Sequence, residues 1–351
     1  MDSLTQILLG GAVAAAVAPH GHRRAALLAG AALGTFPDLD VFPIALWTDD
    51  QVQRVTLHRG LTHSLLVLPW IGLALWAWLR TRGGRVAQSP GRWFVAIQLA
   101  LLTHPVLDAF TVYGTQLLWP LATPPVMWSS MFIIDPLYTV WLLLGCVVAW
   151  FARGRRAARI ALVAGLALSS GYLGLSLAAK AAVERHAGSA LAALGLGHAP
   201  RISVPMPFTT LLWRVLVMTP DGYLEGEWSL VADRGPMQFR HYRADPGLRA
   251  EAATLPAARR LDWFTRGFWK VEERDGKLVL SDLRMGAEPD YVFRYLLAVR
   301  EGGEWRAVRP AQVSWPDRDD RALARVWERI WAPAVPAAGL ADPAAPGTGA
   351  R

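Results

Sequence analysis

The chain has 351 residues, of which 53% are hydrophobic, and its mean hydropathy is +0.25. These values exclude an ordinary soluble protein and favour one with several membrane segments. The net charge of +8 comes almost entirely from arginine, and the arginines cluster beside apolar segments, so membrane topology explains them better than nucleic-acid binding does. The 17 tryptophans fit a protein with much membrane–water interface. The single cysteine, Cys146, excludes a disulfide framework and a thiolate metal site.

The first half of the chain contains about six apolar segments of the length scale that a bilayer needs. They cover residues 3–19, 25–47, 64–79, 93–112, 131–152 and 160–182. The first is short, and the second is interrupted by TFPDLDVFP, so each of these two is either tilted or partly re-entrant. We therefore predict that residues 1–182 form an α-helical membrane bundle of about six transmembrane or re-entrant helices.

Charged residues predict the orientation of this bundle. Ten of the twelve arginines within residues 1–182 fall in three short loops, at residues 23–24, 80–92 and 153–159, and these loops contain no acidic residue. The positive-inside rule places them in the cytoplasm, and six crossings then put both termini outside a bacterial inner membrane. The acidic residues of this half lie at or near the opposite helix ends: Asp2, Asp38, Asp40, Asp49, Asp50, Asp108 and Asp135.

The character of the chain changes near residue 183. LLWRVLVM, YLEGEWSLV and KLVLSDLRM are short β-rich runs, and Asp275-Gly276 is a hairpin signal between two of the expected strands. Residues 250–266 and 319–331 have helical patterns. We predict a small α+β extracytoplasmic domain over 183–331 and a disordered Pro/Ala/Gly-rich tail over 332–351.

Two motifs of the first half carry potential metal ligands close together. PDLD places Asp38 and Asp40 in a turn, where both carboxylates can converge on one cation or remain solvated. HRGLTH provides His58 and His63, with Arg59 between them available to an anionic group. Alternatively, both histidines belong to an interfacial loop.

Three further sites lie at helix ends. THPVLD places His104 and Asp108 four residues apart on one helix face, where they either pair or share a metal. FIIDP places Asp135 before a proline, which an ordinary helix start explains, although it could also bind metal or orient a ligand. In MDSLTQ, a helix cap at Ser3 or Asp2 is the simpler interpretation.

Ionisable residues in membrane segments are costly, so this many on one side of a bundle indicates function. One or two divalent cations would neutralise them. A His/Asp set without cysteine favours Zn²⁺, with Mn²⁺ or Fe²⁺ as alternatives. The predicted metal ligands are Asp38, Asp40, His58, His63, His104, Asp108 and Asp135.

The ordered motifs MDSLTQILLGGAV, GTFPDLDVF, HRGLTHSLL, LTHPVLDAFTVYGTQLLWP and FIIDPLYT resemble the YdjM/YfhP family of membrane-bound metal-dependent hydrolases. The resemblance covers roughly residues 1–300. The family's PDxD, HRGxTHS and HPxxD motifs match at the predicted ligands, whereas many members have His where this chain has Gln6. The pattern is also distantly similar to zinc-dependent phospholipase C, which implies hydrolysis of a phosphoester on lipid.

These observations lead to two alternative functions. The first is a membrane-embedded metal-dependent hydrolase of a lipid-like phosphoester at the outer leaflet, acting through metal-activated water. Asp40 or Asp108 would accept the proton and Arg59 would steady the anionic substrate. The second is a non-enzymatic membrane scaffold or envelope-stress protein in which the metal only holds the helices together. Membrane lipid is the expected partner, and nucleic acid is not.

Reporter fusions test the predicted topology. Fusions after Arg24, Arg85 and Arg156 should report a cytoplasmic location, and a fusion at the C-terminus should report an extracytoplasmic one, because positive charge is retained on the cytoplasmic side. A cytoplasmic signal from the C-terminal fusion would contradict the predicted orientation.

Overall fold

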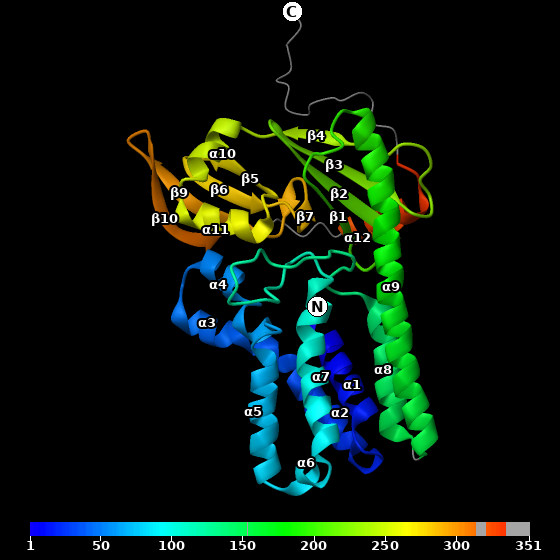
Figure 1. The fold of residues 1–351 in the computed structure, drawn as a ribbon. Helices are drawn as coiled ribbons and strands as arrows, with labels where there is room; N and C mark the ends of the chain where they lie inside the picture. The colour runs from blue at the N-terminus through cyan, green and yellow to red at the C-terminus, as the bar shows by residue number, and fades with distance from the viewer. Residues whose placement is uncertain (153, 314–320, 335–351) are drawn as a thin grey trace, which may run out of the picture. The chain divides into compact units, whose positions relative to one another are not determined.

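A computed structural model describes residues 1–152, 154–313 and 321–334 of the chain. The chain forms two compact units, Met1–Ala178 and Ala179–Arg351. The first is helical and the second contains the β-sheets (Figure 1). Because the long helix α9 (Arg155–Ala193) contributes to both units, the chain passes from one to the other without a loop. The predicted disordered tail falls largely outside the described residues.

The helical unit contains eight α-helices before α9 and three short 3-10 turns within the described residues. The helices are α1 (Ser3–Val17), α2 (Arg23–Thr35), α3 (Val41–Trp47), α4 (Gln51–Leu57), α5 (Leu68–Thr81), α6 (Gly84–Gln88), α7 (Pro90–Ala109) and α8 (Pro136–Phe151). The turns are η1 (His20–His22), η2 (Phe36–Asp40) and η3 (Leu61–His63).

Three aspartates start helices of this unit. Asp2 caps α1 by accepting a hydrogen bond from the Thr5 amide, and Asp50 and Asp135 cap α4 and α8 in the same way. A carboxylate at this position satisfies amide groups that have no partner within the helix. The predicted helix cap at Ser3 or Asp2 is therefore confirmed, and Asp2 is the capping residue.

The prediction of six membrane crossings is not confirmed. Among the residues that the structure describes, two helical runs could span a bilayer by length and composition, His20–Trp47 and Arg155–Ala193, and a bent pair over Gln51–Thr81 could form a third. Helices α1 and α8 are apolar but have only 15 and 16 residues. At about 1.5 Å per residue they extend for roughly 22–24 Å, which is less than the ~30 Å hydrocarbon core. The expected segment 131–152 is shortened because Asp135 and Pro136 start α8 after a loop.

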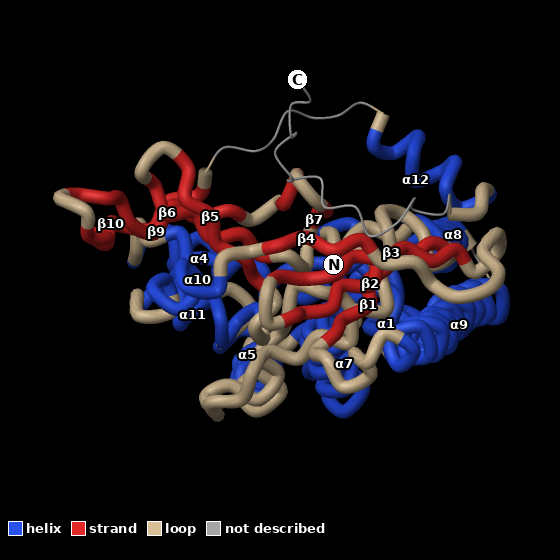
Figure 2. The backbone as a smooth tube through the Cα atoms, turned by 90° about the horizontal axis from the view of Figure 1, so that it is seen from above, coloured by secondary structure: helices blue, strands red, loops and turns tan. Residues whose placement is uncertain are grey.

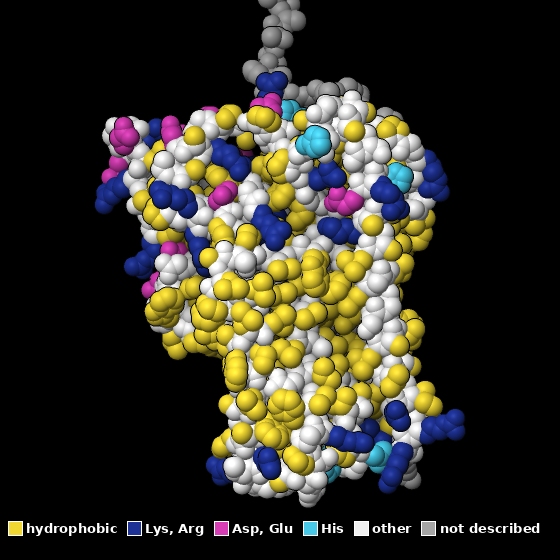
Figure 3. Space-filling model, in the orientation of Figure 1, with side chains coloured by type: hydrophobic (Ala, Val, Ile, Leu, Met, Phe, Trp, Pro, Cys, Tyr) yellow, Lys and Arg dark blue, Asp and Glu magenta, His cyan; other side chains and the backbone are white. Residues whose placement is uncertain are grey.

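The two ends of the helical unit differ in charge. Dark blue Lys and Arg side chains gather at the lower end of this unit, below a yellow apolar band (Figure 3). Helix α7 illustrates the polarity, because Arg92 lies near its start and Asp108 near its end, about 24 Å apart along the axis. Clustering of Lys and Arg at one end of an apolar unit is typical of membrane proteins.

The second unit contains two four-stranded antiparallel sheets, which are seen as separate red groups in Figure 2. The order of the first is β1-β2-β3-β4 and that of the second is β10-β9-β6-β5. The strands are β1 (Arg201–Pro205), β2 (Leu212–Thr219), β3 (Gly222–Ser229), β4 (Arg240–Arg243), β5 (Trp269–Arg274), β6 (Lys277–Asp282), β9 (Arg294–Glu301) and β10 (Glu304–Gln312). The short strands β7 (Gly286–Ala287) and β8 (Asp290–Tyr291) form a separate hairpin.

The local predictions for this unit met different outcomes. The hairpin at Asp275-Gly276 is confirmed, since β5 and β6 pair directly on either side of it. The helical pattern over 250–266 corresponds to two helices, α10 (Pro246–Ala252) and α11 (Pro256–Thr265). Pro256 disfavours helical backbone at the residue before it, so the helix must restart there. The last predicted helix is α12 (Ala322–Trp331).

A buried polar network joins the two sheets. The Tyr223 hydroxyl on β3 donates to Glu288, and the Tyr291 hydroxyl on β8 donates to Glu225. Lys270 on β5 forms an ion pair of 2.7 Å with Glu288. Burial raises the pKa of both tyrosines well above the usual range, so their hydroxyls remain donors at physiological pH.

Helices α1 and α2 pack backbone to backbone through glycine. A Cβ atom added at Gly30 would lie 2.2 Å from the Gly10 carbonyl oxygen, and one added at Gly34 would lie 2.4 Å from the Gln6 carbonyl oxygen. Small residues allow this close approach, which is a common way for membrane helices to associate. The crossing fixes the end of α2 beside α1, immediately before the PDLD motif.

A larger residue at the crossing should destabilise the helical unit. Gly30→Val should lower its unfolding free energy by about 1–3 kcal/mol or more, because the helices must separate to accept the side chain. Gly174→Val is the control, since a Cβ atom there meets no other atom within 4 Å. Thermal unfolding of both variants in detergent measures the difference, and equal midpoints would contradict the close crossing.

Candidate metal centre

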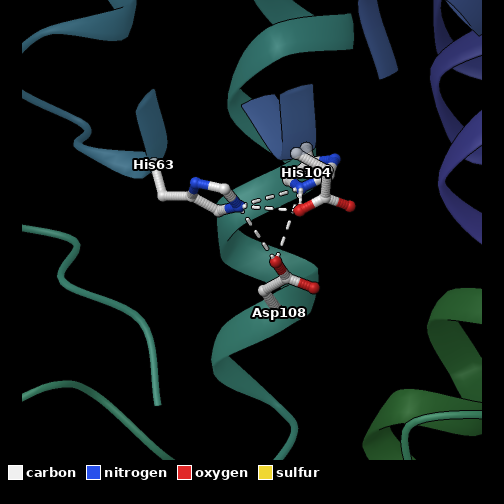
Figure 4. Close-up of side chains that lie close together, drawn as sticks. His63, His104 and Asp108 are labelled. Carbon is white, nitrogen blue, oxygen red and sulfur yellow. Dashed lines mark hydrogen bonds and ion pairs between the residues drawn. The ribbon is translucent and has the colours of Figure 1, made fainter. Parts of the chain in front are cut away.

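Four potential ligands converge from three segments of the helical unit. Asp38 lies on η2, His63 on η3, and His104 and Asp108 on successive turns of α7. One ligand atom from each lies within 4.8 Å of all the others. Figure 4 shows His63 directed toward His104 and Asp108, which project from the same side of α7. The predicted common face of His104 and Asp108 is therefore confirmed.

The spacing of these atoms suits a small tetrahedral ion. The His63 Nε2 atom lies 3.1 Å from His104 Nε2, 3.2 Å from Asp38 Oδ1 and 3.4 Å from Asp108 Oδ2. His104 Nε2 lies 3.4 Å from each of the two carboxylate oxygens. These five separations are close to the ~3.3 Å between two ligands that are each about 2.0 Å from a tetrahedral Zn²⁺ ion, and the two carboxylate oxygens lie within 4.8 Å of one another.

Hydrogen bonds behind the two imidazoles define their tautomers. His104 Nδ1 lies 2.6 Å from the Gly34 carbonyl oxygen, which can only accept, so this nitrogen carries the proton. His63 Nδ1 lies 3.1 Å from the Thr62 hydroxyl, which itself donates to Asp40. When both rings are neutral, their Nε2 atoms therefore present lone pairs to one another. Such outer partners commonly orient metal-binding histidines.

The two oxygens of the buried Asp108 carboxylate have different hydrogen-bond partners. Its Oδ1 atom accepts hydrogen bonds from the Met1 amine and from Gln6 Nε2. Its Oδ2 atom is buried and accepts no hydrogen bond within the described residues, although Arg59 Nε lies 3.2 Å away as an ion-pair partner. A buried oxygen without a donor, directed at two imidazole nitrogens, fits a metal ligand.

Asp40 and His58 form a pair beside this group. Asp40 Oδ1 lies 2.7 Å from His58 Nδ1, and Asp40 Oδ2 accepts from the Thr62 hydroxyl at 2.8 Å. His58 Nε2 lies 3.9 Å from Asp38 Oδ1, farther than His63 Nε2 at 3.2 Å or His104 Nε2 at 3.4 Å from the same oxygen. The pair thus contacts the ligands from outside.

Two other predicted site residues, Arg59 and Asp135, do not belong to the four clustered ligands. Arg59 is buried with its guanidinium between Asp108 and the ring of Tyr113, and its backbone is left-handed, with φ of 62°. Asp135 caps α8 and accepts from the Tyr172 hydroxyl at 2.9 Å, so the structure does not bring it into the four-residue group.

The sequence comparisons place this site in a family context. The family model for the YdjM inner membrane protein matches residues 1–183. The chain belongs to the YdjM family. The matched region contains all four clustered ligands and extends to the boundary between the two compact units. No curated protein and no solved structure matches the chain.

Sequence reasoning missed two groups that support this YdjM-family site, the Gly34 carbonyl and the Thr62 hydroxyl. Gln6, which stands where many family members have His, donates to Asp108. Thr62 could have been found as the polar residue directly before His63 in HRGLTH. The Gly34 carbonyl carries no sequence signal, because every residue has one and only the packing of α2 against α7 selects it.

Ligand variants test the metal centre. His63→Ala and His104→Ala should each remove the divalent ion that elemental analysis of purified protein detects, because each loses one of four ligands. Asp135→Asn should retain it, since Asp135 lies outside the group. Metal retention in both alanine variants would contradict the site.

An outer-partner variant tests the tautomer argument. Thr62→Val should weaken metal affinity by about 10–100-fold, because His63 loses the group that holds its Nδ1 proton. Thr103→Val is a matched control, since the Thr103 hydroxyl donates to the Leu99 carbonyl within α7. Competition with a chromophoric chelator measures both affinities, and equal values would refute the role of Thr62.

Proposed function

We propose that the protein is a membrane-embedded metal-dependent hydrolase that acts on a lipid-like phosphoester at the outer leaflet. The observation that supports this most directly is the convergence of two Nε2 lone pairs on the Asp38 and Asp108 oxygens. Asp38, His63, His104 and Asp108 would hold a divalent ion, with zinc as the preferred candidate. Such an ion acidifies a water molecule and polarises a phosphoryl oxygen.

The surrounding residues suit hydrolysis. The water oxygen bonds to phosphorus, the bond from phosphorus to the ester oxygen breaks, and the leaving oxygen takes up a proton. His58 is suited to accept the water proton and to return it, because Asp40 holds its Nδ1 and leaves Nε2 directed toward Asp38. This assignment gives His58 the proton-transfer role expected of Asp40 or Asp108, with Asp40 orienting it. Arg59 neutralises Asp108 rather than meeting substrate.

A second candidate is a structural metal that stabilises the helical unit of a non-enzymatic scaffold. The observation in its favour is that four protein ligands with tetrahedral spacing complete a site, whereas catalytic zinc usually keeps one position open. Asp38 distinguishes the two candidates, because its side chain is 23% exposed while the other three ligands are buried. Displacement of Asp38 would open the site.

Hydrolysis of phospholipid in mixed micelles tests the proposal. Purified protein with Zn²⁺ should release phosphorylated or dephosphorylated lipid products, and His58→Asn should reduce kcat by about 10²–10⁴-fold, the range for loss of a general acid–base. That variant should retain its metal. Full metal occupancy with no hydrolysis, together with a large fall in thermal stability on chelation, would instead support the structural candidate.

A further inference from the structure

Helix α3 is an apolar helix that the rest of its unit barely covers. Its sequence is VFPIALW, and all seven residues are described and at least partly exposed. Leu46 is 90% exposed and Trp47 is 73% exposed. A short helix with such a surface cannot be stabilised in water by its own contacts. Some apolar medium or partner must therefore cover it.

Contacts at its end hold α3 in a defined position. Arg54 on α4 donates from Nε to the Thr48 carbonyl at 2.7 Å and from Nη2 to the Ala45 carbonyl at 3.1 Å. The same Nη2 atom pairs with Asp49 at 3.1 Å. Carbonyl groups at a helix end need such donors. These Arg54 contacts therefore fix the end of α3 while its apolar side chains remain exposed.

The length of the preceding run gives the depth of α3. The candidate span His20–Trp47 has 28 residues in η1, α2, η2 and α3, which is more than the ~20 helical residues that cross the hydrocarbon core. Arg23 and Arg24 begin this run at the basic end of the unit. Its last part, α3, then lies where acyl chains meet head groups, and Trp47 is a residue that prefers that layer.

The exposed ligand Asp38 lies on η2, which directly precedes the apolar helix α3. His63, His104 and Asp108 are buried, whereas Asp38 is 23% and His58 is 19% exposed, so a substrate must approach past these two. Exposed Leu39 lies between Asp38 and Asp40 in the chain, and exposed Leu61 lies two residues before His63. A molecule that approaches Asp38 and His58 therefore passes the exposed apolar side chains of Leu39 and Leu61.

We infer that α3 is seated in the acyl–head-group boundary and that substrate reaches Asp38 and His58 laterally from the bilayer, as an amphiphile whose acyl chains stay in lipid. This inference rests on the proposed function for its substrate. Lipid is the occupant because the apolar surface continues onto α5, where Trp70 and Leu73 are also exposed, and because these helices belong to a unit with candidate membrane spans.

Depth-dependent quenching tests the position of α3 without any activity. A fluorescent label on Leu46→Cys, in a Cys146→Ala background, should be quenched by lipids with a nitroxide on the acyl chain in phosphatidylcholine–phosphatidylglycerol vesicles. A label on Gln53→Cys, which is exposed on α4, is the control and should be quenched at least about threefold less. Equal, weak quenching at both positions would overturn the inference, as would Leu46→Cys cross-linking between two copies.

Substrate preference tests the lateral route. The protein should cleave a diacyl phospholipid in vesicles faster than a water-soluble phosphodiester. The double variant Phe42→Gln/Leu46→Gln should lose about tenfold on the diacyl substrate, because polar side chains weaken insertion, and should be unchanged on the soluble one. Phe42→Leu/Leu46→Met, which keeps the surface apolar, should behave as the unaltered protein.

The outcomes separate the inference from the proposed function. If the unaltered protein cleaves neither substrate, the proposed function fails, and quenching at Leu46 still decides where α3 lies. If it cleaves both equally and the glutamine variant is unaffected, the lateral route is wrong while the hydrolase function stands.

Discussion

Two imidazole nitrogens face one another at 3.1 Å, and each ring already uses its second nitrogen as a donor, so two neutral rings need a proton or a metal ion between them. The remaining architecture of the helical unit follows from meeting this requirement. Asp38 and Asp108 add negative charge to the same point, and Arg59 and the Met1 amine offset part of it. Bringing so many polar groups into an apolar bundle is costly unless each is paired. A divalent cation would complete the balance.

The individual ligand motifs were predictable where local spacing determines geometry. Because His104 and Asp108 are four positions apart, any α-helix places them on one face. Asp38 and Asp40 were harder, because a turn can direct both carboxylates to one cation or separate them. Here the η2 turn sends Asp38 to His63 and His104, and Asp40 to His58 and Thr62. The separation depends on η3 packing beside η2, which no spacing in the sequence reveals.

The same limit explains the membrane segments. Hydropathy identified where apolar helices lie, but it did not locate their ends. Asp135 and Pro136 delay α8, and α9 continues well beyond the apolar stretch at 160–182 into the second unit. In that unit the Asp275-Gly276 hairpin was predictable because both residues adopt left-handed backbone, which the turn demands. The polar links between its sheets join residues more than 60 positions apart and were beyond sequence reasoning.

The glycine crossing of α1 and α2 has a consequence for the cell. Gly34 serves two purposes at once: its missing side chain admits the α1 backbone, and its carbonyl holds the His104 proton. Helix association and ligand orientation are therefore one cooperative event. Metal that binds only the assembled unit stabilises it by mass action. Chains made under metal starvation would open more often, and proteolytic quality control would lower their abundance. Supply of the ion would thus set how much of the protein the membrane contains.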